Sequence, residues 1–85
     1  MSMSQAIVLP DLGAGADESN VRISAWLAEP GEMILQGDRI VELLIPGMTF
    51  DVPAPVSGRL TRIDKFLDAA VSAGDVLGWI EPEPD

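Results

Sequence analysis

The side chains of this chain that could take part in chemistry are carboxylates, hydroxyls and a single amine. Its 85 residues include no His and no Cys, and Lys65 is the only lysine. Without an imidazole or a thiolate, the usual general base, thiol nucleophile and zinc ligands are missing. The remaining polar groups show no recognisable catalytic spacing. The sequence therefore predicts a protein that is not an enzyme and has no catalytic residue and no metal ligand.

The charge balance narrows the range of partners. There are 5 Lys and Arg residues against 14 Asp and Glu residues, which gives a net charge of −9. Phosphate backbones and acidic membrane surfaces repel such a chain. We therefore expect a protein partner, no nucleic acid and no membrane. The first six residues lack a basic region followed by an apolar run, which favours a cytoplasmic location.

The elements that must position these residues are short strands. Gly and Pro recur at short intervals, and no stretch long enough for a stable helix lies between them. Only residues 64–73 could hold a helical turn, and this segment is more typical of a loop that leads into a strand. Short strands between frequent turns predict an all-β sandwich or barrel. The expected strands are residues 6–9, 21–27, 39–45, 49–52, 59–63 and 76–80.

The strongest regularity is an internal repeat with an offset of 37 residues and no gap. Each half contains two apolar pairs three residues apart, separated by a turn and a Gly-Asp dipeptide. Side chains alternate along a flat strand with a period of two, so a spacing of three predicts a bulge or bend. We expect two bent hairpin-like halves that share one core. The matched residues are Ile23 and Leu60, Trp26 and Ile63, Ile34 and Val71, Gly37-Asp38 and Gly74-Asp75, Ile40 and Leu77, and Leu43 and Ile80.

The order and spacing of five segments resemble the biotinyl/lipoyl carrier domain family, and most closely the lipoyl domains of 2-oxo acid dehydrogenase acyltransferases. These segments are residues 9–15, 26–32, 37–43, 51–58 and 73–81. The resemblance implies a flattened barrel-sandwich hybrid of two quasi-symmetric four-stranded antiparallel sheets. It places the β domain at residues 6–81, with a disordered N-terminus at 1–5 and a flexible acidic tail at 82–85.

The functional position of the family differs in this sequence. Lipoyl domains carry lipoate as an amide on a lysine at a hairpin tip, and biotin domains use the same position. With the flanking motifs in register, that position falls on Gly47. Because glycine has no amine, the resemblance implies no attached lipoate or biotin at this tip. Lys65 matches Ala28 in the repeat, which predicts a solvated loop lysine rather than a second attachment point.

The tip itself is apolar. Pro46 and Gly47 suit the two central positions of a type II turn, because proline fixes φ and glycine accepts a positive φ. The candidate interaction residues are Leu44, Ile45, Pro46, Gly47, Met48 and Phe50. Residues 11–20 could fold over them, or they could contact a partner or a second copy of the chain. Core packing is the favoured interpretation for Trp26, and for Trp79 it competes evenly with a surface role.

These observations predict a noncovalent interaction or scaffold module related to 2-oxo acid dehydrogenase assemblies, with self-association through the tip as a further expectation. The alternative is a lipoyl or biotin carrier domain of an acyltransferase or carboxylase complex. In that case the attached group would be on another residue, and Lys65 is the sole lysine for it.

Overall fold

The computed structural model describes residues 3–11 and 21–83, which form seven strands and no helix. Six strands match the expected segments, with bounds that differ by no more than two residues. The short strand β3 was not expected. Residues 64–73 form a loop of bends and turns with one isolated bridge at Ala70, and no helix, as predicted. The strands are β1 (Gln5–Val8), β2 (Arg22–Trp26), β3 (Met33–Ile34), β4 (Arg39–Ile45), β5 (Met48–Pro53), β6 (Gly58–Ile63) and β7 (Val76–Pro82).

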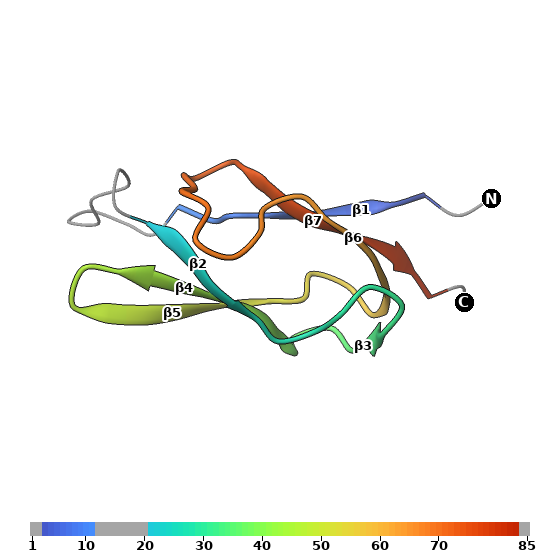
Figure 1. Ribbon diagram of the computed structural model, residues 1–85. Helices are drawn as coiled ribbons and strands as arrows, with labels where there is room; N and C mark the ends of the chain where they lie inside the picture. The colour runs from blue at the N-terminus through green and yellow to red at the C-terminus, as the bar shows by residue number, and fades with distance from the viewer. Residues whose placement is uncertain (1–2, 12–20, 84–85) are drawn as a thin grey trace.

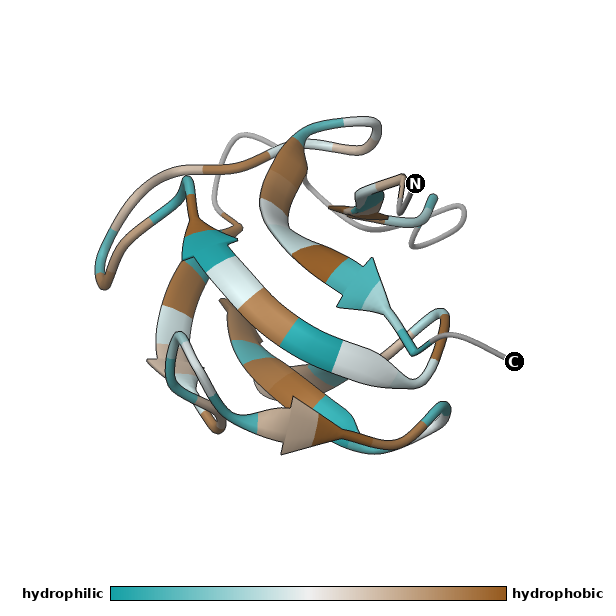
Figure 2. Ribbon diagram, turned by 90° about the vertical axis from the view of Figure 1, so that its right-hand side faces the viewer, coloured by the Kyte–Doolittle hydropathy of each residue, from teal (hydrophilic) through white to brown (hydrophobic). Residues whose placement is uncertain are grey.

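The strands form two antiparallel sheets. One has the order β1-β7-β6-β3, and the other has the order β2-β4-β5 (Figure 1). Hydrophilic and hydrophobic residues alternate along the strands (Figure 2), so each sheet has an apolar face that must be buried. The predicted all-β fold of two antiparallel sheets is therefore confirmed.

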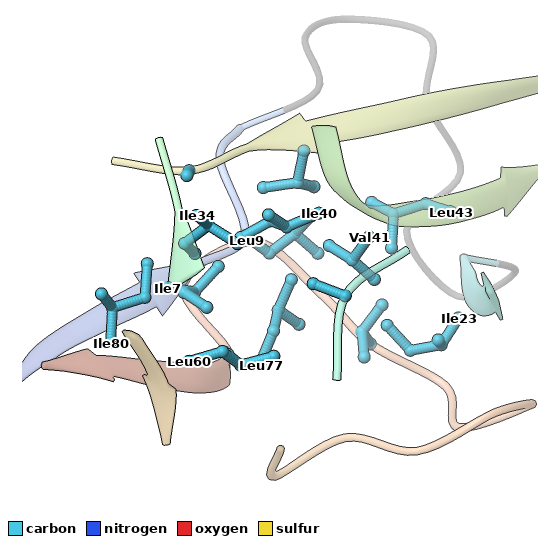
Figure 3. Close-up of a cluster of buried hydrophobic side chains, with 14 of the residues drawn as sticks. Ile7, Leu9, Ile23, Ile34, Ile40, Val41, Leu43, Leu60, Leu77 and Ile80 are labelled. Carbon is cyan, nitrogen blue, oxygen red and sulfur yellow. The ribbon is translucent and has the colours of Figure 1, made fainter. Parts of the chain in front are cut away.

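The core lies between the sheets and draws on both halves of the chain. Most of the matched apolar pairs of the repeat lie in it, which confirms that the two halves share one core. The side chains of Ile7, Ile23, Ile40, Leu43, Leu60, Leu77 and Ile80 are fully buried (Figure 3).

Matched hydrogen bonds confirm the repeat of 37 residues. The amide of Leu35 donates to Asp38 Oδ2 at 3.0 Å, and the amide of Ser72 donates to Asp75 Oδ2 at 2.9 Å. Gly37 and Gly74, the glycines of the two Gly-Asp dipeptides, each have a φ of 91°. Each turn therefore combines a positive φ at glycine with an aspartate that binds the local backbone.

The predicted bends are also present at matched places. The pairing of β2 with β4 shifts register between Ile23 and Ala25. The pairing of β6 with β7 shifts register between Leu60 and Arg62. These shifts allow apolar residues three positions apart to face the same core.

The repeat extends to the fourth strand of each sheet. Met33 of β3 pairs with Arg59 of β6, and an isolated antiparallel bridge joins Ala70 to Arg22 of β2 at the matched place. The second sheet thus has three strands among the described residues, with one bridge where the fourth would lie. The expected pair of four-stranded sheets is thus complete in one sheet and reduced to three strands and a bridge in the other.

The predicted domain boundaries concern the chain ends. β1 begins at Gln5 and β7 ends at Pro82. Disorder of residues 1–5 and flexibility of 82–85 stay predictions. The described residues contain no helix long and apolar enough to span a membrane.

Candidate functional site

The predicted hairpin is formed by β4 and β5, joined through Pro46 and Gly47. Ile45 pairs with Met48 across this turn. Gly47 has a φ of 84°, the value that a type II turn requires at its second central position. The turn lies at one end of the molecule, and the described chain ends lie at the other (Figure 1).

The structure divides the six predicted tip residues between core and surface. Leu44 and Met48 are 50% and 56% exposed, and Pro46 and Gly47 are exposed as well. Ile45 is only 8% exposed and belongs to the core, and half-buried Phe50 packs against that core. Successive side chains of a strand point to opposite faces, so Leu44 and Ile45 cannot both reach a partner. Of the loop proposed to cover the tip, residues 12–20 lie outside the described residues.

Lys65 lies in the loop that follows β6 and not in a hairpin turn. Its amide donates to the carbonyl of Leu77 at 3.1 Å. Its own carbonyl accepts a hydrogen bond from Nε1 of Trp26 at 2.8 Å. Trp26 packs against the core, as predicted, so the backbone of Lys65 is held on both sides.

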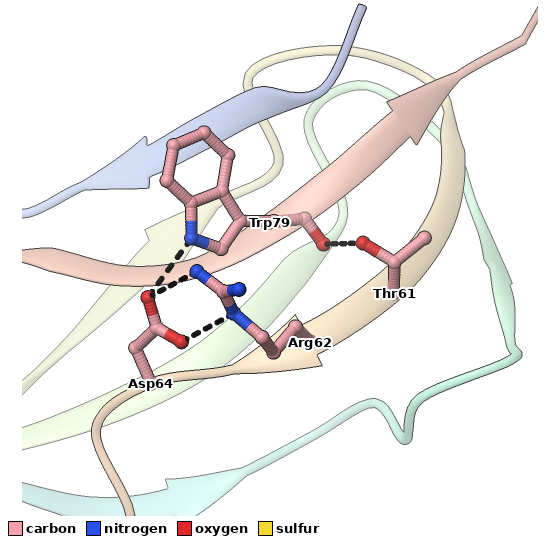
Figure 4. Close-up of polar contacts among 4 residues, drawn as sticks. All are labelled: Thr61, Arg62, Asp64 and Trp79. Carbon is pink, nitrogen blue, oxygen red and sulfur yellow. Dashed lines mark hydrogen bonds and ion pairs between the residues drawn. The ribbon is translucent and has the colours of Figure 1, made fainter.

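Trp79 lies outside the core and forms a surface cluster that the sequence did not predict. Its Nε1 donates to Asp64 Oδ2 at 2.9 Å (Figure 4). Arg62 Nε donates to Asp64 Oδ1 at 2.7 Å, and the guanidinium lies 5.6 Å from the centroid of the Trp79 ring. The hydrogen bonds from Arg62 and Trp79 lower the pKa of Asp64. Arg62 and Trp79 are cross-strand partners, and their counterparts in the repeat, Ala25 and Glu42, are paired in the same way on β2 and β4.

A hollow of about 460 Å³ adjoins this cluster and is lined by Ser4, Thr61, Arg62 and Trp79. Its polar groups are hydroxyls and an arginine that is already paired with Asp64. Such groups can bind a ligand but do not supply a nucleophile with an adjacent base. Within the described residues, no group of three or more acidic side chains is placed to hold a metal ion.

The second sheet carries charged residues on its outer face, on the strands that lead to and from the hairpin turn. Ser24 donates to Glu42 at 3.0 Å, and Arg39 pairs with Asp51 at 3.4 Å. Glu42 and Asp51 are direct cross-strand partners. Each carboxylate thus has its own donor, which offsets the repulsion between like charges on opposite strands.

Sequence comparisons with known proteins identify the family to which this fold belongs. The sequence model of the family described as "Biotin-requiring enzyme" matches residues 5–80. The chain is 29% identical over 83 residues to the dihydrolipoyllysine-residue succinyltransferase component of the 2-oxoglutarate dehydrogenase complex of Rickettsia typhi, covering 98% of this chain and 20% of that protein. Its identity to the same component from Bacillus subtilis is 30% over 74 residues, covering 87% of this chain and 17% of that protein.

A relative of a second kind is the lipoamide acyltransferase component of the branched-chain alpha-keto acid dehydrogenase complex of Pseudomonas putida. It is 25% identical over 80 residues, covering 94% of this chain and 18% of that protein. The chain thus spans about a fifth of the length of the curated relatives it matches. With its two antiparallel sheets and its β4–β5 hairpin, the chain belongs to the biotin/lipoyl domain family, as a carrier-type domain related to the acyltransferase components of 2-oxo acid dehydrogenases.

Proposed function

We propose that this chain is a carrier-type domain that works without an attached group, as a noncovalent interaction module in an assembly of the 2-oxo acid dehydrogenase type. The observation that carries the proposal is Gly47. It occupies the second central position of the hairpin turn, with a φ of 84° and no side chain. An amide bond to a cofactor carboxylate needs a primary amine, and this turn offers none.

The position of Lys65 supports the same proposal. Attachment at a protruding turn requires an amine that extends freely into solvent. Lys65 is half-buried, and its backbone is bound to Trp26 and Leu77. It therefore differs in setting from a hairpin apex, although it is the only lysine of the chain.

The partner in this proposal is a protein. Relatives of the chain are named as components of 2-oxo acid dehydrogenase complexes, which are multiprotein assemblies. At the hairpin, Leu44 and Met48 offer exposed apolar contacts. Apolar side chains gathered at one end of a strongly acidic chain suit a protein interface. The cytoplasmic location expected from the N-terminal sequence is part of the same proposal.

The test is the intact mass of the protein purified from its host. We expect the mass of the unmodified polypeptide. A lipoyl or biotinyl adduct would overturn the proposal, and the Lys65→Arg variant would then show whether the adduct is on Lys65.

A second measurement asks whether the turn has lost only its amine. Purified protein is incubated with a lipoate-attaching ligase, ATP and lipoate. Wild type should remain unmodified, whereas Gly47→Lys restores an amine at the apex and is expected to be modified. Thr49→Lys is the matched control, because it adds an exposed amine two residues away on β5. Lipoylation of wild type would contradict the proposal.

A further inference from the structure

The outer face of the four-stranded sheet carries an aromatic side chain that the fold does not require. The counterpart of Trp79 in the repeat is Glu42, which is half-buried as well. The counterpart of its cross-strand partner Arg62 is Ala25. The same backbone arrangement therefore accepts a carboxylate and a methyl group at these two places. Trp79 is nevertheless fixed outside the core by its hydrogen bond of 2.9 Å to Asp64 (Figure 4).

A bulge in β6 places two polar side chains beside Trp79. The pairing of β6 with β7 shifts register between Leu60 and Arg62. Leu60 is buried, and Ile63 packs against the core. The two residues between them, Thr61 and Arg62, are both exposed and lie on the outer face.

A small residue on the other neighbouring strand leaves space beside the indole. Ala6 of β1 is the cross-strand partner of Trp79, and its side chain is a single methyl group. The hollow of about 460 Å³ lies at this place, lined by Ser4 next to β1 and by Thr61 and Arg62 of β6. Its volume is within the range of about 300–1,000 Å³ that is typical of small-molecule sites.

The polar groups of the hollow can still both donate and accept hydrogen bonds. Asp64 accepts from Nε and Nη2 of Arg62 at 2.7 and 3.2 Å, and Nη1 has no partner among the described residues. The hydroxyl of Ser4 also has no partner within the described part of the chain. Thr61 Oγ1 donates to the carbonyl of Trp79 at 3.2 Å and keeps its acceptor lone pairs. A ligand here can therefore accept from Arg62, donate to Thr61 and do either with Ser4.

The charges at the hollow favour a neutral ligand. Arg62 is already paired with Asp64, so the one cation among the lining residues is compensated. The whole chain has a net charge of −9 and repels anions. A cationic ligand would find no carboxylate among the lining residues.

We propose that this hollow binds a neutral sugar ring, the pyranose of a glycoside or short oligosaccharide. The C–H groups of a pyranose are polarised by the adjacent oxygen atoms, so they are attracted to the negative face of the Trp79 indole. Its hydroxyls both donate and accept, which matches the groups offered by Ser4, Thr61 and Arg62. The proposal goes beyond the function proposed above and does not depend on it, because the hollow and the β4–β5 hairpin belong to different sheets.

The experiment is an NMR titration of the complete, nitrogen-labelled chain with methyl β-glucoside, methyl β-galactoside, methyl α-mannoside and cellobiose. The chain has two tryptophans, so one indole N–H signal reports on the hollow and the other on the core. We expect at least one sugar to shift the Trp79 signal saturably, with a dissociation constant of about 1–10 mM. The Trp26 signal should not move, because its Nε1 is bonded to the carbonyl of Lys65 and its ring packs against the core.

Two substitutions remove the wall and the donors of the hollow. Trp79→Glu and Arg62→Ala introduce the residues that the other half carries, so the fold should be retained. Each should raise the dissociation constant about tenfold or more, followed through the amide signals of Ser4 and Thr61. An unchanged Trp26 indole signal shows that the variant is folded.

A matched pair of serine variants tests the hydroxyl. Ser4→Ala removes it from the hollow and should weaken binding severalfold. Ser24→Ala is the control, because Ser24 is the counterpart of Thr61 and lies on the outer face of the other sheet. Its dissociation constant should equal that of wild type.

A matched pair of ligands tests the charge argument. The uronic acid form of the sugar that binds differs from it by one carboxylate, and it should bind more weakly. Binding of the neutral sugar should be the same at about 20 mM and about 300 mM NaCl.

Three results would overturn the proposal. In the first, no neutral sugar shifts the Trp79 signal saturably up to about 100 mM. In the second, the uronic acid binds more tightly than the neutral sugar, which would make Arg62 an anion site. In the third, folded Trp79→Glu binds the sugar as well as wild type does. None of these results affects the intact-mass measurement, so the two proposals are tested separately.

Discussion

Nε1 of Trp26 donates a hydrogen bond to the carbonyl of Lys65, across 39 residues of sequence and at a distance of 2.8 Å. This bond connects the end of β2 to the loop after β6, and it ties the only lysine of the chain to a core-packed indole. The backbone of the loop at Lys65 is consequently held against the core.

The first prediction concerns this bond. Trp26→Phe keeps an aromatic ring but removes the donor and leaves the Lys65 carbonyl without this partner. We expect a loss of about 1–3 kcal/mol in the free energy of unfolding, measured by urea denaturation. Trp79→Phe is the comparison, because Trp79 lies outside the core. It should cost less, and an equal loss would contradict the assignment of Trp26 to the core.

The second prediction concerns Asp64. Its pKa is below the ordinary value because Arg62 and Trp79 donate hydrogen bonds to the ionised carboxylate. In a carbon-detected NMR titration, Arg62→Gln should raise this pKa the most, and Trp79→Phe should raise it less. If neither change raises the pKa, the hydrogen-bonded cluster does not persist in solution.

The same shift has a consequence for stability against pH. The pKa of Asp64 is lower in the folded than in the unfolded chain, so its carboxylate stabilises the fold when the pH is above the pKa of the unfolded state. That contribution is lost as the pH falls through the pKa of the folded state. Urea denaturation over the acid range should show a smaller fall in stability for Arg62→Gln than for wild type. This difference in stability should be small, because solvent screens the interactions of a carboxylate at the surface.

The third prediction concerns the close approach of β6 to β7. A Cβ atom at Gly78 would lie 2.6 Å from the carbonyl oxygen of Arg62 and 3.1 Å from the indole of Trp26. We expect Gly78→Ala to cost about 2–3 kcal/mol in urea denaturation, because backbone atoms must shift. In Gly47→Ala the new Cβ meets no atom within 4 Å, but the φ of 84° is unfavourable. That variant should lose only about 1 kcal/mol.

The fourth prediction separates the two neighbouring apolar residues of the tip. Ile45→Lys places an ammonium in the core and should lower the free energy of unfolding by about 3 kcal/mol or more. Leu44→Lys changes an exposed side chain and should alter it by less than about 0.5 kcal/mol. Both are measured at low protein concentration, so that association does not contribute. Equal losses would contradict the alternation along β4.

Much of the fold could be predicted from the spacing of apolar residues and from the turn dipeptides. The repeat identified the core pair Leu43 and Ile80, and Gly37 and Gly74 marked two turns with positive φ. These features follow from local backbone preferences and from burial, and both are properties of the sequence itself. β3 was missed because a strand of two residues has no periodicity to recognise.

The surface was harder to predict because side-chain direction depends on register. Alternation along a strand places Leu44 and Ile45 on opposite faces of β4, but only the structure shows that Ile45 is the one that faces the core. The cluster of Trp79, Arg62 and Asp64 depends on contacts between β7 and the end of β6. No local pattern specifies such contacts, which arise when the strands are aligned.

The repeat also relates the hairpin turn to the opposite end of the domain. Leu43 pairs with Phe50 beside the turn, and Ile80 pairs with Gln5 at the matched place near the chain ends. The same strands could therefore be connected in a different order along the chain. A circularly permuted chain, opened between Pro46 and Gly47 with β7 joined to β1 by a short linker, should reach the same architecture, which would make the apex a place to insert a fusion partner or a label.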